Sequence, residues 1–459
     1  MWEQGDDAVA QKPVVTIVGG GSFNWSPTII RDTMLTEGLE RTEFRLLDVN
    51  AKAAETVAAL GRKLAAEWDL PTAFVPTTNP DAALKGADFV IITISTGGLA
   101  AMKPDLEVPE RFGIFQTVGD TVGPGGWSRA LRNIPVFVDL GIRIRELAPK
   151  AAVLNYTNPL TILTRTLSLV TDQPVVGLCH GVFENYRVLQ AVFGLKSEDE
   201  IKATIGWINH FFWILDLTIR GRDGYDMLNR KLKRAGKRLA DLIREAHTDG
   251  CGFHRDAEVC SELYHQYGLL PYASDRHPSE FLSRYITPTE DRLKAYKLVR
   301  TSIADRRQGE RSRAKRMRDW ISGKRPFPRQ RSREAAASII QAMTLGQEFV
   351  DVMNVSNRGQ IANLPEGAVV ETLGVVNAGG FHPSTVGPLP EPIADMVSRH
   401  VVNQELIVGA GMAGDRDVAF NALINDPVCS HLTVPRIREM GERLLKANKR
   451  YLPQFRLRK

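Results

Sequence analysis

The feature of this sequence that most constrains its fold is a short apolar run that stops at three glycines. Residues 13–18 are rich in β-branched side chains, Gly19, Gly20 and Gly21 follow them directly, and residues 26–37 can form a helix. A buried strand, a tight turn and a helix in this order let the backbone approach a pyrophosphate at the helix N-terminus. The run therefore predicts the first unit of a dinucleotide-binding domain.

Further strand candidates alternate with helix-prone stretches along the first half of the chain. They lie at residues 43–47, 88–94, 152–154 and 174–178. Strands that alternate with helices pair in parallel and form a doubly wound sheet. From about residue 206 the pattern changes, with one strongly apolar strand candidate at residues 207–215 before long charged stretches. The predicted fold class is α/β, a Rossmann-like doubly wound sheet followed by an α+β lobe of the lactate and malate dehydrogenase-like type.

Asp48 stands at the end of the second strand candidate. A carboxylate at this point accepts hydrogen bonds from both ribose hydroxyls and repels a 2′-phosphate, which favours NAD over NADP. A turn-forming aspartate is the alternative interpretation. The glycine motif is incomplete, because Asn24 occupies the place of its final glycine. The residues expected to bind the cofactor are Gly19, Gly20, Gly21, Ser22, Phe23, Asp48, Asn79, Thr96 and Asn155.

The length of the chain predicts more than one lobe. A chain of 459 residues exceeds the usual size of one hydrophobic core, so two closely packed lobes are expected. The change of pattern places their boundary near residue 200. The predicted organisation is an N-terminal tail at residues 1–12, an NAD-binding Rossmann-like domain at residues 13–200, and a domain for catalysis, substrate binding and oligomerisation at residues 201–459.

The formal net charge is +6, and much of the positive excess lies between Arg306 and Arg333. This basic segment is either a solvated helical face or an anion-attracting rim. No zinc-finger, helix-turn-helix or aromatic-basic RNA-binding signature accompanies it, so no nucleic-acid partner is expected. With 43% hydrophobic and 24% charged residues, the composition is that of a soluble globular protein, and a folded enzyme is the default class.

The four cysteines, Cys179, Cys251, Cys260 and Cys429, are widely separated and form no CxxC pair. A disulfide framework is therefore not expected in a chain of this length. The first twelve residues lack the apolar core of a secretory signal, and no apolar run is long enough to span a bilayer. These features predict a cytoplasmic protein without a membrane partner.

Polar groups gather where the predicted strands end, and ligands bind at that edge of open α/β sheets. Asn155 begins such a polar segment, Cys179 and His180 follow the next strand, and His210 belongs to the strand after that. Each residue alone is more typical of a core position than of a ligand. Together, an amide, a thiolate and imidazoles at one edge suit a borderline-soft divalent ion with open coordination positions.

Ordered motifs cover nearly the whole chain, from Val15 to about Tyr451. They are residues 19–22, 119–126, 131–135, 155–159, 179–181, 209–210, 354–360 and 409–417. Together they resemble glycoside hydrolase family 4, the NAD-dependent and usually manganese-dependent glycosidases that form an exception to two-carboxylate hydrolysis. The resemblance implies a small-molecule glycoside substrate, NAD and a divalent metal such as Mn²⁺ as cofactors, and a homodimer or homotetramer.

The resemblance also implies roles for individual residues. Cys179 and His210 would hold the metal, Asn158 and Asp120 would contact the substrate, and His180 would assist departure of the leaving group. In the implied reaction, C3 of the sugar is transiently oxidised and a base removes the C2 proton. The glycosidic bond is then eliminated, water adds, and the hydride returns to C3.

The general base of some family members is a tyrosine. In the corresponding stretch of this chain, residues 270–277, Asp275 is the preferred candidate for the base. Tyr272 and Tyr267 are the alternatives. Asp275 would then be the group that removes the C2 proton.

The triplet Cys-His-Gly at residues 179–181 resembles the branch of the family that acts on α-linked uronic acids, which are α-galacturonides and α-glucuronides. Arg276 or His277, or a cation elsewhere in the pocket, would bind the anionic C6 group. A surface ion pair is the alternative interpretation of Arg276. Residues 95–98 lack the arginine of phosphosugar-specific relatives, which disfavours a 6-phosphoglycoside. A sulfoquinovoside, with a sulfonate at C6, remains a second candidate.

Two other classes of protein share parts of this pattern. A conventional NAD-dependent 2-hydroxy acid dehydrogenase has the same glycine turn and two-lobed architecture, but it accumulates NADH with its substrate. A nucleotide-binding regulator without turnover would retain Cys179 and His210 as vestiges, and Cys179→Ser would then change no activity.

Overall fold

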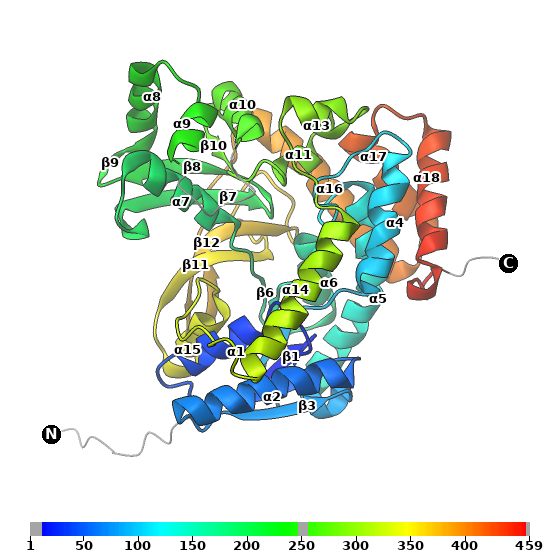
Figure 1. Ribbon diagram of the computed structural model, residues 1–459. Helices are drawn as coiled ribbons and strands as arrows, with labels where there is room; N and C mark the ends of the chain where they lie inside the picture. Colours follow the sequence, from blue (N-terminus) through cyan, green and yellow to red (C-terminus); the bar gives the residue numbers. More distant parts are fainter. Residues whose placement is uncertain (1–11, 247–255, 456–459) are drawn as a thin grey trace.

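Figure 1 shows the computed structural model, which describes residues 12–246 and 256–455. Residues 1–11 of the predicted tail, and Cys251, lie outside these ranges. Within them, Cys179, Cys260 and Cys429 form no disulfide. None of the helices in the two described ranges is long and apolar enough to cross a bilayer.

Six parallel strands form the first half of the sheet. They are β1 (Val14–Val18), β2 (Glu43–Leu47), β3 (Ala73–Thr77), β4 (Phe89–Ile92), β5 (Ala152–Asn155) and β6 (Val175–Gly177). Their order, β3-β2-β1-β4-β5-β6, is that of a Rossmann fold, and the predicted doubly wound sheet is confirmed. The β3 strand lies at the edge of the sheet, where its Pro76 is tolerated and a long apolar run is not needed.

Helices connect these strands. They are α1 (Ser26–Met34), α2 (Ala51–Trp68), α3 (Pro80–Leu84), α4 (Gly98–Glu110), α5 (Gly123–Leu147), α6 (Leu160–Val170) and α7 (Gly181–Phe193). The α2 helix begins after Asn50, whose Oδ1 accepts a hydrogen bond from Ala53 N at 3.1 Å. The α1 helix ends before the predicted residue 37, because the N–H of Thr36 turns back to the carbonyl of Thr33.

The second half of the chain extends the same sheet with antiparallel strands. They are β7 (Ile201–Ile208), β8 (Phe211–Ile219), β9 (Arg222–Asp223), β10 (Leu270–Pro271), β11 (Phe349–Ser356), β12 (Val369–Asn377) and β13 (Gly380–Pro383). From β6 the sheet continues through β11, β12, β7 and β8 to β10. The junction is the pairing of Asn354 in β11 with Gly177 in β6. The second half is therefore continuous with the Rossmann-like sheet.

The single strand predicted at residues 207–215 is wrong, because this segment is a hairpin of β7 and β8. Ile208 pairs with Phe211, and the two residues between them form the turn. His210 in this turn has a φ of 68°, in the left-handed region. The sequence hides the turn because both strands are apolar and buried and neither turn residue is glycine or proline. His210 thus lies at the tip of a hairpin.

Eleven α-helices and three short 3₁₀ helices complete the described part of the second half and its C-terminal region. They are α8 (Gly224–Ala235), α9 (Leu239–Ala246), α10 (Glu258–Tyr267), α11 (Pro278–Phe281), α12 (Ser283–Ile286), α13 (Asp291–Ala295), α14 (Ile303–Ile321), α15 (Ala336–Leu345), α16 (Glu391–Ala413), α17 (Arg416–Asn425), α18 (Val434–Ala447), η1 (Glu198–Glu200), η2 (Pro427–Cys429) and η3 (Lys449–Tyr451).

The α14 helix carries much of the basic segment and returns to the first half of the chain (Figure 1). At its start, Ile303 packs with Met102 and Leu106 of α4. Near its end, Met317 joins a buried core that contains residues of α1, α2 and α15, including Ile339. The helix is therefore fixed at both ends by apolar contacts, and its charged middle lies between them.

Candidate active site

The glycine turn between β1 and α1 is packed too tightly for any other residue. Gly19 has a φ of 92°, and a Cβ on it would lie 2.8 Å from the carbonyl oxygen of Thr93. A Cβ on Gly20 would lie 2.6 Å from the Cα of Leu46. Both glycine N–H groups donate to the carbonyl of Leu47. The turn is thereby held against β2 and β4, which is where a Rossmann fold receives a dinucleotide.

The Asp48 carboxylate lies against this turn. Its Oδ2 accepts a hydrogen bond from Gly21 N at 3.0 Å, and its Oδ1 accepts one from Asn50 N at 2.8 Å. A Cβ on Gly21 would lie 2.8 Å from the same Oδ2. Asp48 therefore stands at the end of β2, where a ribose-binding carboxylate is expected.

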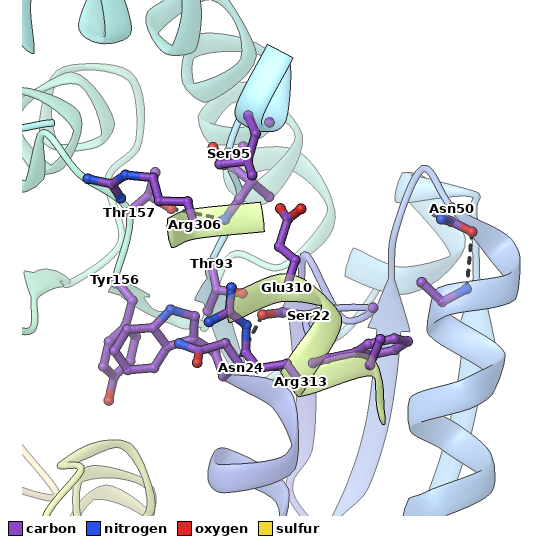
Figure 2. Close-up of a pocket in the computed structure, with 18 of the residues that line it drawn as sticks. Ser22, Asn24, Asn50, Thr93, Ser95, Tyr156, Thr157, Arg306, Glu310 and Arg313 are labelled. Carbon is purple, nitrogen blue, oxygen red and sulfur yellow. Dashed lines mark hydrogen bonds between the residues drawn. The ribbon is translucent and has the colours of Figure 1, made fainter. Parts of the chain in front are cut away.

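A cavity of about 1040 Å³ opens at the carboxyl ends of the parallel strands (Figure 2). Residues 21–25 line it, and so do the segments that follow β4 and β5, at residues 93–95 and 156–158. Side chains of α2 and α14 also line it. Ser22 and Phe23 face this space as predicted positions for the cofactor, and the volume is sufficient for a dinucleotide.

Three of the residues predicted to bind the cofactor form hydrogen bonds with nearby groups of the protein. The Asn79 Oδ1 accepts hydrogen bonds from the first N–H groups of α3, and Thr96 donates to Asn133 Oδ1 at 2.7 Å. Asn155 is completely buried, and its Oδ1 accepts a hydrogen bond from Thr157 N at 2.8 Å. These side chains shape the loops around the cavity, and Thr93, Ser95 and Tyr156 line it beside them.

The predicted substrate residues Asp120 and Asn158 line the same cavity as the glycine turn. Beside them lies Arg129 of α5, whose Nε donates to the backbone carbonyl of Asn158 at 2.8 Å. Asp120 also accepts a hydrogen bond from the Thr121 hydroxyl at 3.1 Å. A carboxylate, an amide and a guanidinium therefore meet where a sugar bound next to the dinucleotide would lie.

Thr121 links this part of the cavity to the predicted metal ligand His210. The Thr121 Oγ1 lies 2.9 Å from His210 Nδ1. Burial lowers the pKa of His210 to about 4, which the negative charge of Asp120 partly offsets. His210 is therefore neutral near pH 7, the form in which imidazole binds a metal.

Cys179, the second predicted metal ligand, contacts the neighbour of His210. The side chain of Asn209 is near enough to act on the Cys179 thiol, and Asn209 in turn donates to Glu371 Oε2 at 3.1 Å. Burial raises the pKa of the Cys179 thiol to about 12, and the nearby Glu371 acts in the same direction. The hairpin tip and the end of β6 thus bring one thiol and one imidazole to adjacent positions.

Tyr272 and His277 complete an aromatic cluster around His210. The ring centroid of His210 lies 3.9 Å from that of His277 and 6.1 Å from that of Tyr272. On its other side the Tyr272 ring touches Gly181, where a Cβ would lie 3.0 Å from Tyr272 Cζ. Burial raises the pKa of Tyr272 well above its usual value. Tyr272 therefore lies between the segment that carries Cys179 and the hairpin that carries His210.

Asp275, the preferred candidate for the base, has a different environment. Its two carboxylate oxygens accept hydrogen bonds from Val259 N at 3.0 Å and Cys260 N at 2.9 Å, at the start of α10. Burial raises the pKa of Asp275 to about 7. Its neighbour Arg276 bonds to the carbonyl of Thr117 and to the Thr301 hydroxyl. The contacts of Asp275 are those of a helix-capping side chain, which argues against its predicted role as the base.

His180, the predicted proton donor, pairs with a carboxylate. Its Nδ1 lies 3.2 Å from Glu334 Oε1, and this contact raises the pKa of the imidazole. The His180 ring lies 6.4 Å from that of Trp25, which lines the cavity. The sequence offered no sign of Glu334, because it is more than 150 positions from His180 in an unremarkable loop.

The sequence also missed the cavity-facing side of α14. Arg306, Glu310, Arg313, Met317 and Arg318 line the cavity (Figure 2). The first four are spaced by three or four residues, which places them on one helical face, and Arg318 follows Met317 directly. That spacing, between the apolar anchors of the helix, is a signal that could have identified this wall. The alternative of an anion-attracting rim thereby gains support over that of a purely solvated face.

The described residues supply only part of the coordination that a divalent ion needs. Across residues 12–246 and 256–455, no group of three or more His, Cys, Asp and Glu side chains is arranged to hold a metal. The Cys179 thiol and the His210 imidazole are two donors of suitable chemistry. They fit an ion that completes its coordination with oxygen atoms of substrate or water, as an open catalytic site requires.

The Rossmann order, the cavity at its carboxyl edge, and a thiol and imidazole beside it define a nucleotide-binding α/β enzyme with two joined halves. Residues 14–195 match the model of family 4 glycosyl hydrolases, and residues 206–429 match the model of the C-terminal domain of that family. The chain belongs to glycosyl hydrolase family 4 and is a glycosidase rather than a 2-hydroxy acid dehydrogenase. The two matches divide next to the boundary predicted near residue 200.

Individual relatives agree with this assignment. An α-galacturonidase of Thermoanaerobacterium saccharolyticum is 32% identical over 459 residues, which cover 97% of each chain. The crystal structure of a glucosidase from Bacillus subtilis has a TM-score of 0.84 at 30% identity and covers 95% of this chain and 100% of its own. A 6-phospho-α-glucosidase from gut microorganisms, solved with NAD and Mn²⁺, has the same fold, with a TM-score of 0.78 at 22% identity and coverage of 97% and 100%.

Proposed function

We propose that this protein hydrolyses α-galacturonides with NAD and a divalent metal, Mn²⁺ being the first choice, as cofactors. The observation that carries the proposal is the connection between two sites. Asp120 lines the cavity that begins at the glycine turn, and the next residue, Thr121, contacts His210 of the thiol and imidazole pair. A sugar held at Asp120 would therefore lie between a dinucleotide and that pair.

The choice of a uronic acid rests on two supports. The α-galacturonidase relative matches nearly the full length of both chains. The cavity is lined by five cationic and two anionic side chains, Lys52, Arg129, Arg306, Arg313, Arg318, Asp120 and Glu310. This excess of positive charge favours an anionic sugar in addition to the pyrophosphate of the cofactor.

The cofactors and side chains of the site would have separate roles in the reaction. NAD, when bound, would take and return a hydride at C3, and the metal held by Cys179 and His210 would polarise the oxidised carbonyl. Asp120 and Asn158 would hold the sugar hydroxyls. Tyr272, which contacts both metal-bearing segments, is the better placed candidate to remove the C2 proton, and His180, oriented by its contact with Glu334, would protonate the leaving oxygen.

A panel of 4-nitrophenyl α-glycosides tests this function. Galacturonide, glucuronide, galactoside, sulfoquinovoside and 6-phosphoglucoside would be incubated with NAD, with and without Mn²⁺. We expect nitrophenol release from the galacturonide, no lasting rise in NADH absorbance, and loss of deuterium from C2 to solvent. Preference for a neutral glycoside or for the sulfoquinovoside would refute the substrate assignment. Steady NADH accumulation without nitrophenol would refute the mechanism. A cytoplasmic location and a homo-oligomeric state stay predictions of the sequence.

A further inference from the structure

Arg129 is a buried cation that forms no direct ion pair with a carboxylate of the described residues. Its side chain lines the cavity, and the residue is 9% exposed. The Nε of Arg129 is used by the carbonyl of Asn158. Among the residues that the structure describes, no carboxylate oxygen lies within 4.0 Å of its guanidinium. Asp120 and Asp105 partly offset its charge without pairing directly with it. A buried cation without a directly paired anion is costly, so this position favours an anion from outside the chain.

Arg306 of α14 lines the same cavity as Arg129. Burial lowers the pKa of Arg129 and of Arg276, and the positive charge of Arg306 acts on both in the same direction, so Arg306 lies within electrostatic reach of each. One terminal nitrogen of Arg306 donates to the carbonyl of Val118 at 2.7 Å, while its Nε is buried without a hydrogen-bond partner. In Figure 2 Arg306 lies beside Ser95 and Thr157, which follow β4 and β5.

The acidic groups of α14 form no direct ion pair with Arg306, and the carboxylate of the adjacent Asp305 caps the start of the helix through Ser302. In the described part of the chain, Arg306 forms no ion pair within 4.0 Å, although Glu310 lies one turn further along the helix. Asp120 is the other acidic side chain that lines the cavity, and it already accepts a hydrogen bond from Thr121. The two helices α5 and α14 therefore present guanidinium groups to a shared space that also holds a sugar-binding carboxylate.

We propose that Arg306, which lines the same cavity as the buried Arg129, forms the subsite that binds the carboxylate of the substrate and thereby makes the enzyme selective for uronic acids. The inference rests on the proposed function and names the residue that determines its specificity. A planar guanidinium matches a carboxylate in two-point geometry, and a neutral hydroxymethyl group offers no such charge-assisted contact. Arg276, the sequence-based candidate for this role, is instead held by Thr117 and Thr301.

The test compares Arg306→Met with Arg307→Ala in the NAD- and Mn²⁺-loaded enzyme. Arg307 lies next along α14 and is exposed, and it does not line the cavity. For 4-nitrophenyl α-galacturonide, we expect Arg306→Met to raise KM by about 10- to 100-fold, because a hydrogen bond between charged groups is lost. KM for the matching galactoside should change by less than about threefold, and Arg307→Ala should resemble the parent on both substrates. Arg306→Lys should recover part of the galacturonide affinity.

Equal losses on the galacturonide and the galactoside would overturn the proposal, because they would show a general effect on the cavity. A second measurement separates failure of the subsite from failure of the proposed function. If the parent enzyme cleaves no α-glycoside in the panel, calorimetric binding of galacturonate to the NAD-loaded protein still tests Arg306. Binding that weakens at least about tenfold in Arg306→Met supports the subsite. Equal affinity, or no binding to the parent, overturns it.

Discussion

At the scale of single residues, Tyr272 and Asp275 lie close in sequence but have different neighbours. The Tyr272 ring touches Gly181 and stacks near His210, whereas the Asp275 carboxylate accepts two backbone N–H groups of α10. We expect Tyr272→Phe to slow exchange of the C2 proton by about 100-fold or more, because general-base catalysis contributes at least that factor. Deuterium exchange from C2-labelled substrate, followed by NMR, measures this rate.

Asp275→Asn is the matched variant. It keeps one acceptor oxygen for α10 and should lower the free energy of unfolding by about 1–3 kcal/mol while leaving the exchange rate of the folded enzyme near that of the parent. The opposite pattern, with exchange lost in Asp275→Asn and kept in Tyr272→Phe, would restore Asp275 as the base.

Glu280 makes the stability of the protein depend on pH. Burial raises the pKa of this carboxyl from 4.5 to about 7, although Val118 N and Gly119 N donate to its Oε1. A raised pKa means that the folded state holds the proton more tightly, so this stability is complete below pH 4.5 and is lost as pH rises through 7.

Glu280→Gln removes this dependence. Relative to the variant, the parent should lose up to about 3 kcal/mol of unfolding free energy between pH 4.5 and 8. Thermal unfolding at a series of pH values measures the difference, with exposed Glu290→Gln as the control. A constant difference between parent and variant would show that Glu280 does not titrate in this range.

The sequence located residues whose role depends on local geometry and failed where the role depends on distant partners. Gly19 and Asp48 lie at the ends of recognisable strands, and the topology of a parallel sheet brings them together. The Asp275 carboxylate is held by backbone N–H groups of α10, which the sequence did not place against it. Arg129 is buried by chain segments far from it in sequence, so the absence of a direct ion pair with a described carboxylate could be known only from the structure.

At the scale of elements, five of the six parallel strands were predictable because each is a buried apolar run between turns, whereas the edge strand β3 is largely not buried and was not predicted. The hairpin of β7 and β8 was not, since its two strands read as one continuous apolar run. For the basic segment, the composition was predictable from the sequence but the position in the fold was not. Its charge was evident, but the face that lines the cavity is recognisable only when Ile303 and Met317 are known to fix α14 at both ends.

This placement of α14 predicts a role in cofactor binding. Arg313 lines the cavity, and Arg311, two residues earlier, is exposed on another face. Arg313→Ala should raise the Kd for NAD by about tenfold through loss of a charge-assisted contact to phosphate, and Arg311→Ala should leave it unchanged. Quenching of tryptophan fluorescence measures the Kd, because Trp25 lines the cavity. Equal Kd values for the two variants would place Arg313 away from the nucleotide.

At the scale of the whole molecule, the two halves share one sheet and their hydrophobic cores. Strand β6 of the first half pairs with β11 of the second. The core around β1 and β2 includes Met317, Ile340 and Met353 from beyond residue 200. The boundary predicted near residue 200 marks a change in the sequence pattern, whereas the sheet and the core of the folded protein continue across it.

A fragment that ends at residue 200 should accordingly fail to fold. We expect it to show no cooperative thermal transition by circular dichroism, because its core lacks the side chains supplied by α14, α15 and β11. The full chain, measured in parallel, should unfold cooperatively. A fragment with a sharp transition and affinity for NAD would show that the first half is an independent domain.

Because α14 of the second half packs against the first half, ligand binding in the cavity should stabilise the folded protein. The glycine turn belongs to the first half of the chain, and Arg306, Arg313 and Arg318 of α14 belong to the second. Both sets of residues line a single cavity. A dinucleotide bound there would contact both halves. Separation of the halves on unfolding would therefore lose part of its binding free energy. The loaded protein should for this reason withstand heat better than the empty one.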